Sequence, residues 1–113
     1  MKFAHSSEKL FAEHLDLYNI IWYYEPTSFP LEWGSGAIKK MFTPDFFLPE
    51  YNLYIEITTM NQSLITKKQK KYKNVQKLYP EFRFKLINES MYEDLISGST
   101  TTFEKAIASW EFK

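Results

Sequence analysis

The chain has 113 residues, of which 44% are hydrophobic and 19% aromatic, so it has enough apolar material for one compact core and we expect a single domain spanning residues 1–113. This composition argues against a disordered or linker role. The absence of cysteine excludes a disulfide scaffold and a cysteine nucleophile. The two histidines, His5 and His14, cannot alone make a tetrahedral zinc site. The net charge is zero, and without a membrane-length apolar stretch or an apolar signal region at the N-terminus we expect a cytoplasmic protein.

Residues 5–19 predict an amphipathic helix at the start of the chain. Ser6 or Ser7 can cap this helix, and Glu8 suits the positive end of its dipole. The apolar side chains that recur on one face are Phe11, Leu15 and Tyr18.

The next segments have the composition of strands and a loop. Residues 20–25 are bulky and end at Pro26, which is typical of a strand, whereas residues 27–36 are expected to form a loop. A second strand is predicted over residues 37–48, with an interruption near Pro44 because proline cannot donate to a strand ladder.

A turn at residues 49–52 leads to a third predicted strand over residues 53–58. The short turn implies that the second and third strands pair as an antiparallel hairpin. From residue 62 or 63 to residue 78 the apolar spacing becomes helical, and Pro80 stops this helix.

The C-terminal part predicts one more strand and two helices. Residues 82–87 alternate as a fourth strand, and a short helix is expected over residues 90–96. Thr101 and Glu104 have the spacing of a capping box at the start of the last helix. The apolar face of that helix comprises Phe103, Ala106, Ile107 and Trp110.

The order of these elements is helix, three strands, helix, strand and helices. It predicts an α/β fold in which an antiparallel meander is joined through a right-handed crossover helix to a further strand, giving a mixed sheet flanked by helices. We expect the following aromatic residues to lie in the core rather than to stack on bases: Trp22, Tyr23, Tyr24, Trp33, Phe46, Phe47 and Trp110.

Charge is distributed unevenly along the chain. Residues 57–80 contain six lysines and no acid, so the rest of the chain carries about −6. An ordinary exposed helix mixes glutamate with lysine, and a helix without acids therefore favours contact with nucleic acid. The alternative is a solvated face without a partner. The lysines are Lys67, Lys68, Lys70, Lys71, Lys73 and Lys77.

Asp45 and Glu56 are carboxylates in apolar surroundings. The predicted hairpin can bring them together, and two close carboxylates repel unless a proton or a divalent cation lies between them. We expect a Mg²⁺ or Mn²⁺ site here. For each residue taken alone there is a structural alternative: Asp45 in a Thr-Pro-Asp turn, and Glu56 on the outward side of a half-exposed strand.

Over roughly residues 6–87 the chain resembles the PD-(D/E)xK nuclease superfamily. The resemblance rests on Pro-Asp at residues 44–45, Glu-Ile-Thr at residues 56–58, the preceding helix with its glutamate, and the basic helix that follows. It implies a restriction-endonuclease-like αβββαβ core with extra C-terminal helices, in which one or two divalent metals activate water for phosphodiester cleavage. The metal ligands that it implies are Asp45, Glu56, Glu8 and the backbone carbonyl of Ile57.

The lysine of the family motif is replaced by Thr58, which cannot supply a positive charge. Some members carry this lysine on the following helix, and Lys68 is the candidate here, with Lys67 or Gln69 second. The step from Lys68 to Tyr72 also resembles a helix motif that some members place beside the active site. The inward stripe of this helix is predicted to comprise Ile65, Lys68, Tyr72, Val75 and Tyr79.

The resemblance implies a Mg²⁺- or Mn²⁺-dependent endonuclease that acts on nucleic acid, with DNA favoured over RNA as the substrate. The catalytic residues are predicted to be Asp45, Glu56, Lys68 and Glu8. Contacts to the nucleic-acid backbone are predicted for Lys67, Lys70, Lys71, Lys73, Lys77 and Tyr72. A core this small offers little surface to grip a substrate, so a homodimer is also expected.

Two other functions remain open from the sequence. One is a nuclease fold that has lost cleavage and binds nucleic acid or a protein partner, and the other is an α/β interaction domain unrelated to nucleases. The family resemblance favours a role in phages or mobile elements, in recombination, DNA repair or defence.

Overall fold

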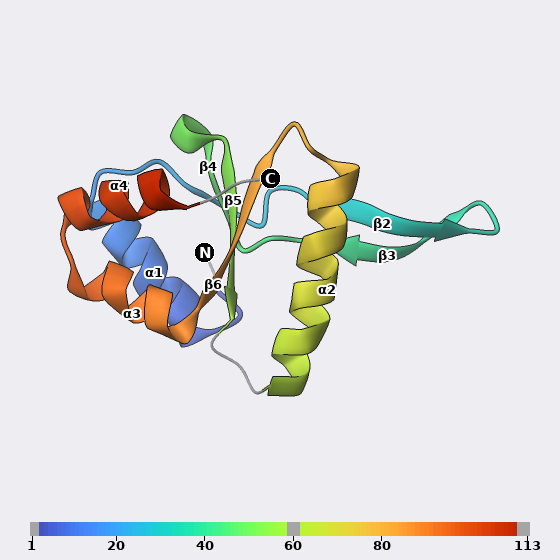
Figure 1. Ribbon diagram of the computed structural model, residues 1–113, viewed down its shortest axis with the longest axis horizontal. Helices are drawn as coiled ribbons and strands as arrows, with labels where there is room; N and C mark the ends of the chain where they lie inside the picture. Colours follow the sequence, from blue (N-terminus) through green and yellow to red (C-terminus); the bar gives the residue numbers. More distant parts are fainter. Residues whose placement is uncertain (1–2, 59–61, 111–113) are drawn as a thin grey trace.

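The chain alternates short strands with helices (Figure 1). The computed structural model describes residues 3–58 and 62–110. In chain order the elements are α1 (Ser6–Leu17), β1 (Tyr23–Tyr24), β2 (Phe29–Gly34), β3 (Ala37–Phe42), β4 (Phe46–Leu48), the 3₁₀ turn η1 (Pro49–Tyr51), β5 (Leu53–Thr58), α2 (Gln62–Leu78), β6 (Arg83–Asn88), α3 (Glu89–Ser97) and α4 (Thr100–Ser109).

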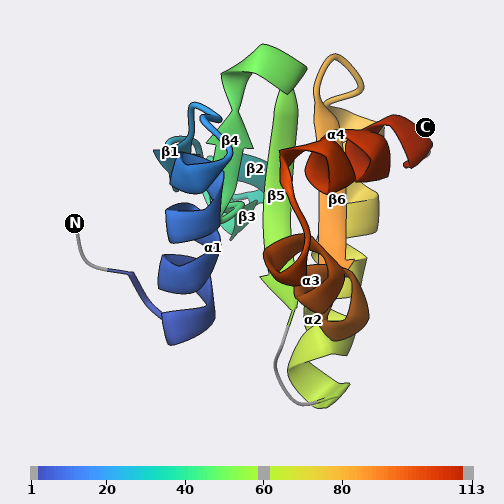
Figure 2. The same cartoon turned by 90° about the vertical axis from the view of Figure 1, so that its left-hand side faces the viewer.

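The main sheet is mixed and has the strand order β1-β4-β5-β6. β1 and β5 each pair antiparallel with β4, whereas β5 and β6 are parallel. A parallel pair needs a long crossover connection, which α2 supplies. Helices α1, α3 and α4 cover one face of the sheet and α2 covers the other (Figures 1 and 2). The predicted α/β class, with a mixed sheet flanked by helices, is therefore confirmed.

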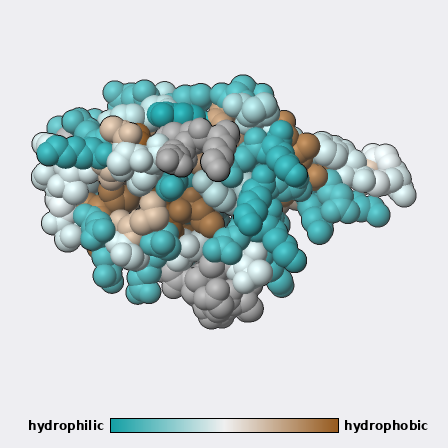
Figure 3. All heavy atoms as spheres, in the orientation of Figure 1, coloured by the Kyte–Doolittle hydropathy of each residue, from teal (hydrophilic) through white to brown (hydrophobic). Residues whose placement is uncertain are grey.

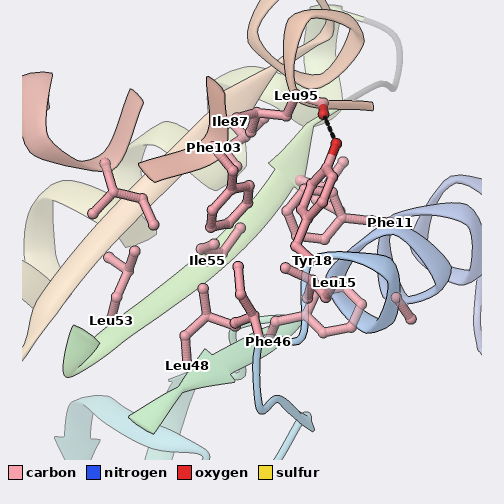
Figure 4. Packing of buried hydrophobic residues seen from close by; sticks show 14 of the residues in the cluster. Phe11, Leu15, Tyr18, Phe46, Leu48, Leu53, Ile55, Ile87, Leu95 and Phe103 are labelled. Atoms are coloured by element: carbon pink, nitrogen blue, oxygen red, sulfur yellow. Dashed lines mark hydrogen bonds between the residues drawn. The ribbon is translucent and has the colours of Figure 1, made fainter. Parts of the chain in front are cut away.

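Two hydrophobic clusters pack against the two faces of the sheet. On the side of α1, α3 and α4, Figure 4 shows the cluster around Phe11, Phe46 and Phe103. The hydroxyl of Tyr18 donates to the carbonyl oxygen of Leu95 at 2.5 Å and joins α1 to α3 in this cluster. The cluster under α2 comprises Phe29, Leu31, Phe42, Tyr54, Val75 and Phe84.

Strand β5 lies between these clusters and is buried at all six positions. Burial on both faces sets the register of β5 strongly, because a slip by one residue would move every side chain to the opposite face. The register therefore also determines where the polar side chains of β5, Glu56 and Thr58, lie in the sheet.

Strands β2 and β3 form a separate two-stranded sheet, which we call the hairpin arm. The loop predicted over residues 27–36 is wrong, because β2 lies within it. Phe29 and its cross-strand partner Phe42 are 3% and 4% exposed in the cluster under α2, a long-range contact that local turn chemistry does not reveal. The single strand predicted over residues 37–48 is two strands in different sheets, β3 and β4, with the expected interruption at Pro44 between them.

The prediction that the large aromatic residues form the core is only partly correct. Phe46 is fully buried, and Trp22 and Tyr24 pack against the same cluster. Tyr23 and Trp33 contradict the prediction, since they are 54% and 56% exposed. Tyr23 lies in β1, a strand of two residues at the edge of the sheet, where one side chain can face solvent.

Both predicted helix caps are wrong. α1 begins at Ser6, and the carbonyl oxygen of the preceding His5 accepts from the Glu8 amide at 3.1 Å. α4 is capped by Ser99, whose hydroxyl accepts from the Thr102 amide at 3.4 Å, in place of the capping box. Several neighbouring serine and threonine residues can cap each helix, and the backbone conformation that selects one of them is set by the incoming chain.

The other predicted elements are confirmed to within a few residues at their ends. The strand over residues 20–25 is shorter than expected, since β1 contains only Tyr23 and Tyr24. Among the helices in the described ranges, none combines the length and apolar character needed to cross a membrane. The confirmed elements are α1, β5, α2, β6, α3 and α4.

Candidate active site

The turn between β4 and β5 brings Asp45 and Glu56 together; we call them the carboxylate pair. Asp45 directly precedes β4, in which Phe46 pairs with Ile55 of β5. The Asp45 amide donates to Glu56 Oε1 at 3.1 Å, and the Ile57 amide donates to Asp45 Oδ2 at 2.8 Å. Each carboxylate is therefore held by the backbone of the neighbouring strand.

The carboxylate pair is withdrawn from water. Asp45 is 6% and Glu56 is 7% exposed, so Glu56 does not lie on the outward side of a half-exposed strand. Burial raises the pKa of Asp45 to about 8, and the nearby charge of Glu56 is the second cause. Burial also raises the pKa of Glu56, although Lys68 opposes this shift. Such a pair favours the uptake of a proton or a cation.

Lys68 reaches the carboxylate pair from α2. Its Nζ lies 2.9 Å from Glu56 Oε2 and donates to the carbonyl oxygen of Ile57 at 2.9 Å. The side chain is 18% exposed, and it follows the same inward stripe of α2 as the fully buried Val75. This is the lysine that the helical spacing predicts to face inward.

The neighbours of Lys68 on α2 do not share its position. Lys67 and Gln69 are exposed, so neither second candidate approaches the carboxylate pair. Ile65, the first residue of the predicted inward stripe, has its side chain outside the described residues. The remaining stripe residues, Tyr72 and Tyr79, are half-buried as expected.

Thr58 has a structural role in the sheet. It is 2% exposed, and its hydroxyl donates to the carbonyl oxygen of Ile87 at 3.0 Å. Thr58 thus links β5 to β6, and the positive charge beside the carboxylate pair comes from Lys68.

Glu8 is a third buried acid near the carboxylate pair. It is 4% exposed on the first turn of α1, and the Tyr24 hydroxyl donates to its Oε1. The Tyr24 hydroxyl in turn accepts from the Ala4 amide at 3.1 Å. The charge of Glu8 contributes to the raised pKa of Asp45 and, after burial, to that of Glu25. Glu8 therefore acts on the pair through space while its bonded partner is Tyr24.

The sequence did not reveal the role of Tyr24. We expected it only in the core, because nothing in a short aromatic run distinguishes a packing tyrosine from one that binds a carboxylate. Its partner on α1 becomes visible only when β1 is docked at the edge of the sheet.

The residues around the carboxylate pair fit a divalent cation in part. In residues 3–58 and 62–110, no group of three or more acidic or histidine side chains is arranged to hold a metal ion. The full set of ligands implied by the resemblance is thus not assembled, since Glu8 is bonded to Tyr24, and Lys68 occupies Glu56 Oε2 and the Ile57 carbonyl. Mg²⁺ commonly binds through one or two carboxylates and keeps several waters, and the closely spaced oxygens of Asp45 and Glu56 fit that mode.

Five other lysines cover the outside of α2, and we call them the lysine face: Lys67, Lys70, Lys71, Lys73 and Lys77. All five are exposed, and Figure 3 shows hydrophilic residues along this helix. A surface hollow of about 730 Å³ lies on the same helix. Its lining residues are Lys70, Lys73, Asn74, Gln76, Lys77 and Pro80. This arrangement presents several positive charges to a polyanion without burying any of them.

Tyr72 lies apart from the lysine face, although the sequence grouped them as backbone contacts. Its hydroxyl donates to the carbonyl oxygen of Phe84 at 3.0 Å and accepts from the side-chain amide Nε2 of Gln76 at 3.3 Å. Tyr72 therefore anchors α2 to β6.

Comparisons of the chain with protein-family models, with curated proteins and with solved structures found no match. The feature of the molecule with the most distinctive chemistry is a buried pair of carboxylates in contact with one lysine, next to a helix that carries five exposed lysines.

Proposed function

We propose that this chain is a divalent-metal-dependent endonuclease of the PD-(D/E)xK type that acts on DNA. The observation that carries the proposal is the contact of Lys68 with Glu56 Oε2 at 2.9 Å, because it brings the charge missing at Thr58 to the buried carboxylate pair. A lysine that served only to solvate α2 would face outward with its neighbours Lys67 and Lys70.

The topology supports the same assignment. If the hairpin arm is treated as an insertion between β1 and β4, the remaining elements run α1, β1, β4, β5, α2, β6. This order matches the αβββαβ series that the resemblance implies, with α3 and α4 as additional C-terminal helices, and it therefore supports the proposal. Asp45 then directly precedes the second strand of the series and Glu56 lies within the third.

The chemistry follows from the charges at the site. Asp45 and Glu56 would hold a divalent cation, which supplies an acidified water and neutralises charge on the phosphate. Lys68 is close enough to Glu56 to orient the attacking water or to stabilise negative charge that develops on the phosphate oxygens. Glu8 adds negative charge nearby, which favours cation binding by the pair.

The lysine face supports a nucleic-acid substrate. Its positive charges would bind the phosphate backbone without reading bases, and each neutralised phosphate adds about one unit to the salt dependence of binding. The hollow lined by Lys70, Lys73 and Lys77 provides a continuous place for such a backbone on α2.

One observation favours a second candidate, a nuclease fold that binds nucleic acid without cutting it. The Lys68 ammonium already contacts Glu56 Oε2 of the carboxylate pair and the adjacent Ile57 carbonyl oxygen, and it compensates part of the charge of the pair. An ion pair of this kind can partner a buried carboxylate without any metal.

Cleavage assays distinguish these functions. Purified protein is incubated with supercoiled plasmid, single-stranded DNA, a four-way DNA junction or single-stranded RNA, with Mg²⁺, Mn²⁺ or EDTA. We expect metal-dependent cutting of DNA that is abolished in Asp45→Ala and falls by about 100-fold or more in Lys68→Ala. Lys67→Ala, a change of an adjacent exposed lysine, is the matched control and should stay within a few-fold of the wild type.

The outcomes separate clearly. Wild-type protein that binds DNA but cuts none of the substrates supports the non-cleaving module and refutes the endonuclease. Cutting that persists in Asp45→Ala contradicts the proposed site. If the chain neither binds nor cuts nucleic acid, both candidates fail.

A further inference from the structure

The hairpin arm extends away from the body of the molecule. Figure 1 shows β2 and β3 leaving the side of α2 and projecting beyond it, and the longest dimension of the molecule is 48 Å against 28 and 26 Å for the others. A two-stranded ribbon has little stability by itself in water. Contacts at its base must therefore stabilise the arm, and the residues at its outer end are candidates for binding a partner.

The base of the arm is anchored firmly. Phe29 and Phe42 are buried under α2, and the Tyr79 hydroxyl of the α2 terminus donates to the carbonyl oxygen of Pro30 at 2.8 Å. The side-chain hydroxyls of Ser28 and Thr43 form a hydrogen bond of 2.7 Å between the segment that enters the arm and the segment that leaves it. These contacts hold the direction of the arm relative to α2.

The outer part of the arm exposes large apolar side chains. Trp33 is 56% exposed and Ile38 is 46% exposed, and the two are cross-strand partners. Met41, opposite Pro30, is 44% exposed. The exposed tryptophan and isoleucine lie side by side on the projecting ribbon, and together they form an apolar surface that a binding partner could cover.

The charges beside these apolar residues are mainly positive. Lys39 and Lys40 are exposed, and Glu32, which lies 3.5 Å from Lys40, is the only acid in residues 29–42. The arm also contacts α2, the helix that carries the lysine face.

We propose that the hairpin arm binds the major groove of duplex DNA, with Trp33 and Ile38 against the bases and Lys39 on the phosphate backbone. The inference deepens the proposed endonuclease function and rests on it. A two-stranded ribbon fits the major groove of B-form DNA, which is about 12 Å wide, whereas the major groove of duplex RNA is too narrow for side chains to enter. The substrate is thus double-stranded DNA, held between the arm and the lysine face.

Charge complementarity favours DNA over a second copy of the chain as the occupant. Two arms packed through their Trp33–Ile38 pairs would bring the lysines of both copies close together, and this repulsion is absent when the partner is a polyanion.

The test measures binding without cleavage. Affinities for a 24-base-pair DNA duplex, its separate strand and a duplex RNA of the same sequence are determined by fluorescence anisotropy in EDTA over a series of salt concentrations. The arm variant is Trp33→Ser with Ile38→Ser. The matched control is Leu17→Ser with Ile21→Ser, which removes two apolar side chains of similar exposure, 71% and 54%, at the end of α1 and just beyond it.

We expect the arm variant to lose about tenfold or more in affinity for duplex DNA, with an unchanged salt slope and little change for the single strand or the duplex RNA. Lys39→Ala should lower the salt slope by about one unit. The control variant should bind like the wild type.

The results can refute the arm proposal without refuting the proposed endonuclease function. If Lys70→Ala with Lys73→Ala weakens binding while the arm variant does not, the arm proposal is overturned and the proposed function stands. Equal losses for single-stranded and duplex DNA overturn the groove assignment. If sedimentation shows a dimer that the arm variant dissociates while its DNA affinity is unchanged, the arm is an interface between copies and the proposal is also overturned. Wild-type protein that binds none of the nucleic acids contradicts both proposals.

Discussion

The carboxylate pair and the lysine face lie at the two sides of α2 and carry opposite charges, but they are built differently. Each carboxylate of the pair is nearly inaccessible to water and bonded to the backbone of the neighbouring strand. The five lysines of the lysine face are exposed and lie on one helix. Buried charges interact strongly and depend on their neighbours, whereas exposed charges are screened and act almost independently.

Lys68 connects the two regions, because it belongs to the lysine-rich helix by sequence and to the carboxylate pair by contact. The position of a lysine along α2 therefore decides whether it makes a specific contact or adds to a general positive potential. Substitutions at buried and exposed positions should differ accordingly.

Lys68→Met should have the largest effect. It removes the ammonium from Glu56 Oε2 and the Ile57 carbonyl, so we expect loss of cleavage and a fall of about 3 kcal/mol in the free energy of unfolding at pH 8, measured by urea denaturation. At pH 5 the loss of stability should be smaller, since the raised pKa of Glu56 lets that carboxyl take up a proton. Lys67→Met is the control. If it lowers cleavage and the free energy of unfolding as much as Lys68→Met does, the proposed difference between buried and exposed lysines is wrong.

Asp45→Asn should change the dependence of stability on pH. The pKa of Asp45 is raised from its ordinary value of 3.8 to about 8, so the folded chain binds this proton more tightly than the unfolded chain. The resulting stability is fully present below about pH 4 and is lost as the pH rises through about 8. In EDTA we therefore expect Asp45→Asn to be more stable than the wild type at pH 8 and similar to it at pH 4.

Metal should reverse this difference. Mg²⁺ or Mn²⁺ favours the ionised carboxylates, so it should raise the melting temperature of the wild type more at pH 8 than at pH 5 and have no effect on Asp45→Asn. Asp94→Asn, an exposed change on α3, is the control. A wild-type stability that does not fall between pH 4 and pH 8 would refute the coupling described for the carboxylate pair.

Tyr24→Phe should have an intermediate effect. It removes the hydroxyl that donates to the buried Glu8, and we expect a loss of about 1–2 kcal/mol in the free energy of unfolding at neutral pH. If Glu8 helps to hold the metal, the variant should also need a higher metal concentration for half-maximal cleavage. Tyr23→Phe, at a side chain that is 54% exposed, is the matched control, and a stability change as large as that of Tyr24→Phe would contradict the assignment.

Thr58→Val should have the smallest effect. The substitution keeps the shape of the side chain and removes only the hydrogen bond to the Ile87 carbonyl, so we expect a loss of about 1 kcal/mol in thermal or urea unfolding. Cleavage should be unchanged within a few-fold, because the Thr58 hydroxyl bonds to β6 and does not contact the carboxylate pair in the described contacts. A large loss of activity in a stably folded variant would assign Thr58 a part in the reaction.

Much of this structure could be predicted from local pattern. The apolar spacing along residues 5–19 and 62–78 predicts α1 and α2, and the short turn after Leu48 predicts the pairing of β4 with β5. That pairing was enough to expect Asp45 beside Glu56. The helical period was likewise enough to separate Lys68 from Lys67, because a rotation of 100° per residue distinguishes neighbours on a helix.

Other features depend on contacts between distant residues. The strand nature of β2 follows from Phe29 packing under α2, about fifty residues away along the chain. The link between Tyr24 and Glu8 needs β1 docked beside α1 at the edge of the sheet. Local composition carries no signal for either, since the same residues would also suit a loop or an ordinary core.

Local sequence pattern is sufficient to predict the α/β class, the positions of the main helices, the meeting of Asp45 with Glu56 and the inward direction of Lys68, since each depends on backbone periodicity or on a short turn. The folded structure is needed to show that β5 is buried on both faces, that the Thr58 hydroxyl bonds to β6, and that the hairpin arm projects with Trp33 exposed. The reason is that burial and docking depend on which surfaces cover one another, and this is settled by the packing of the whole chain.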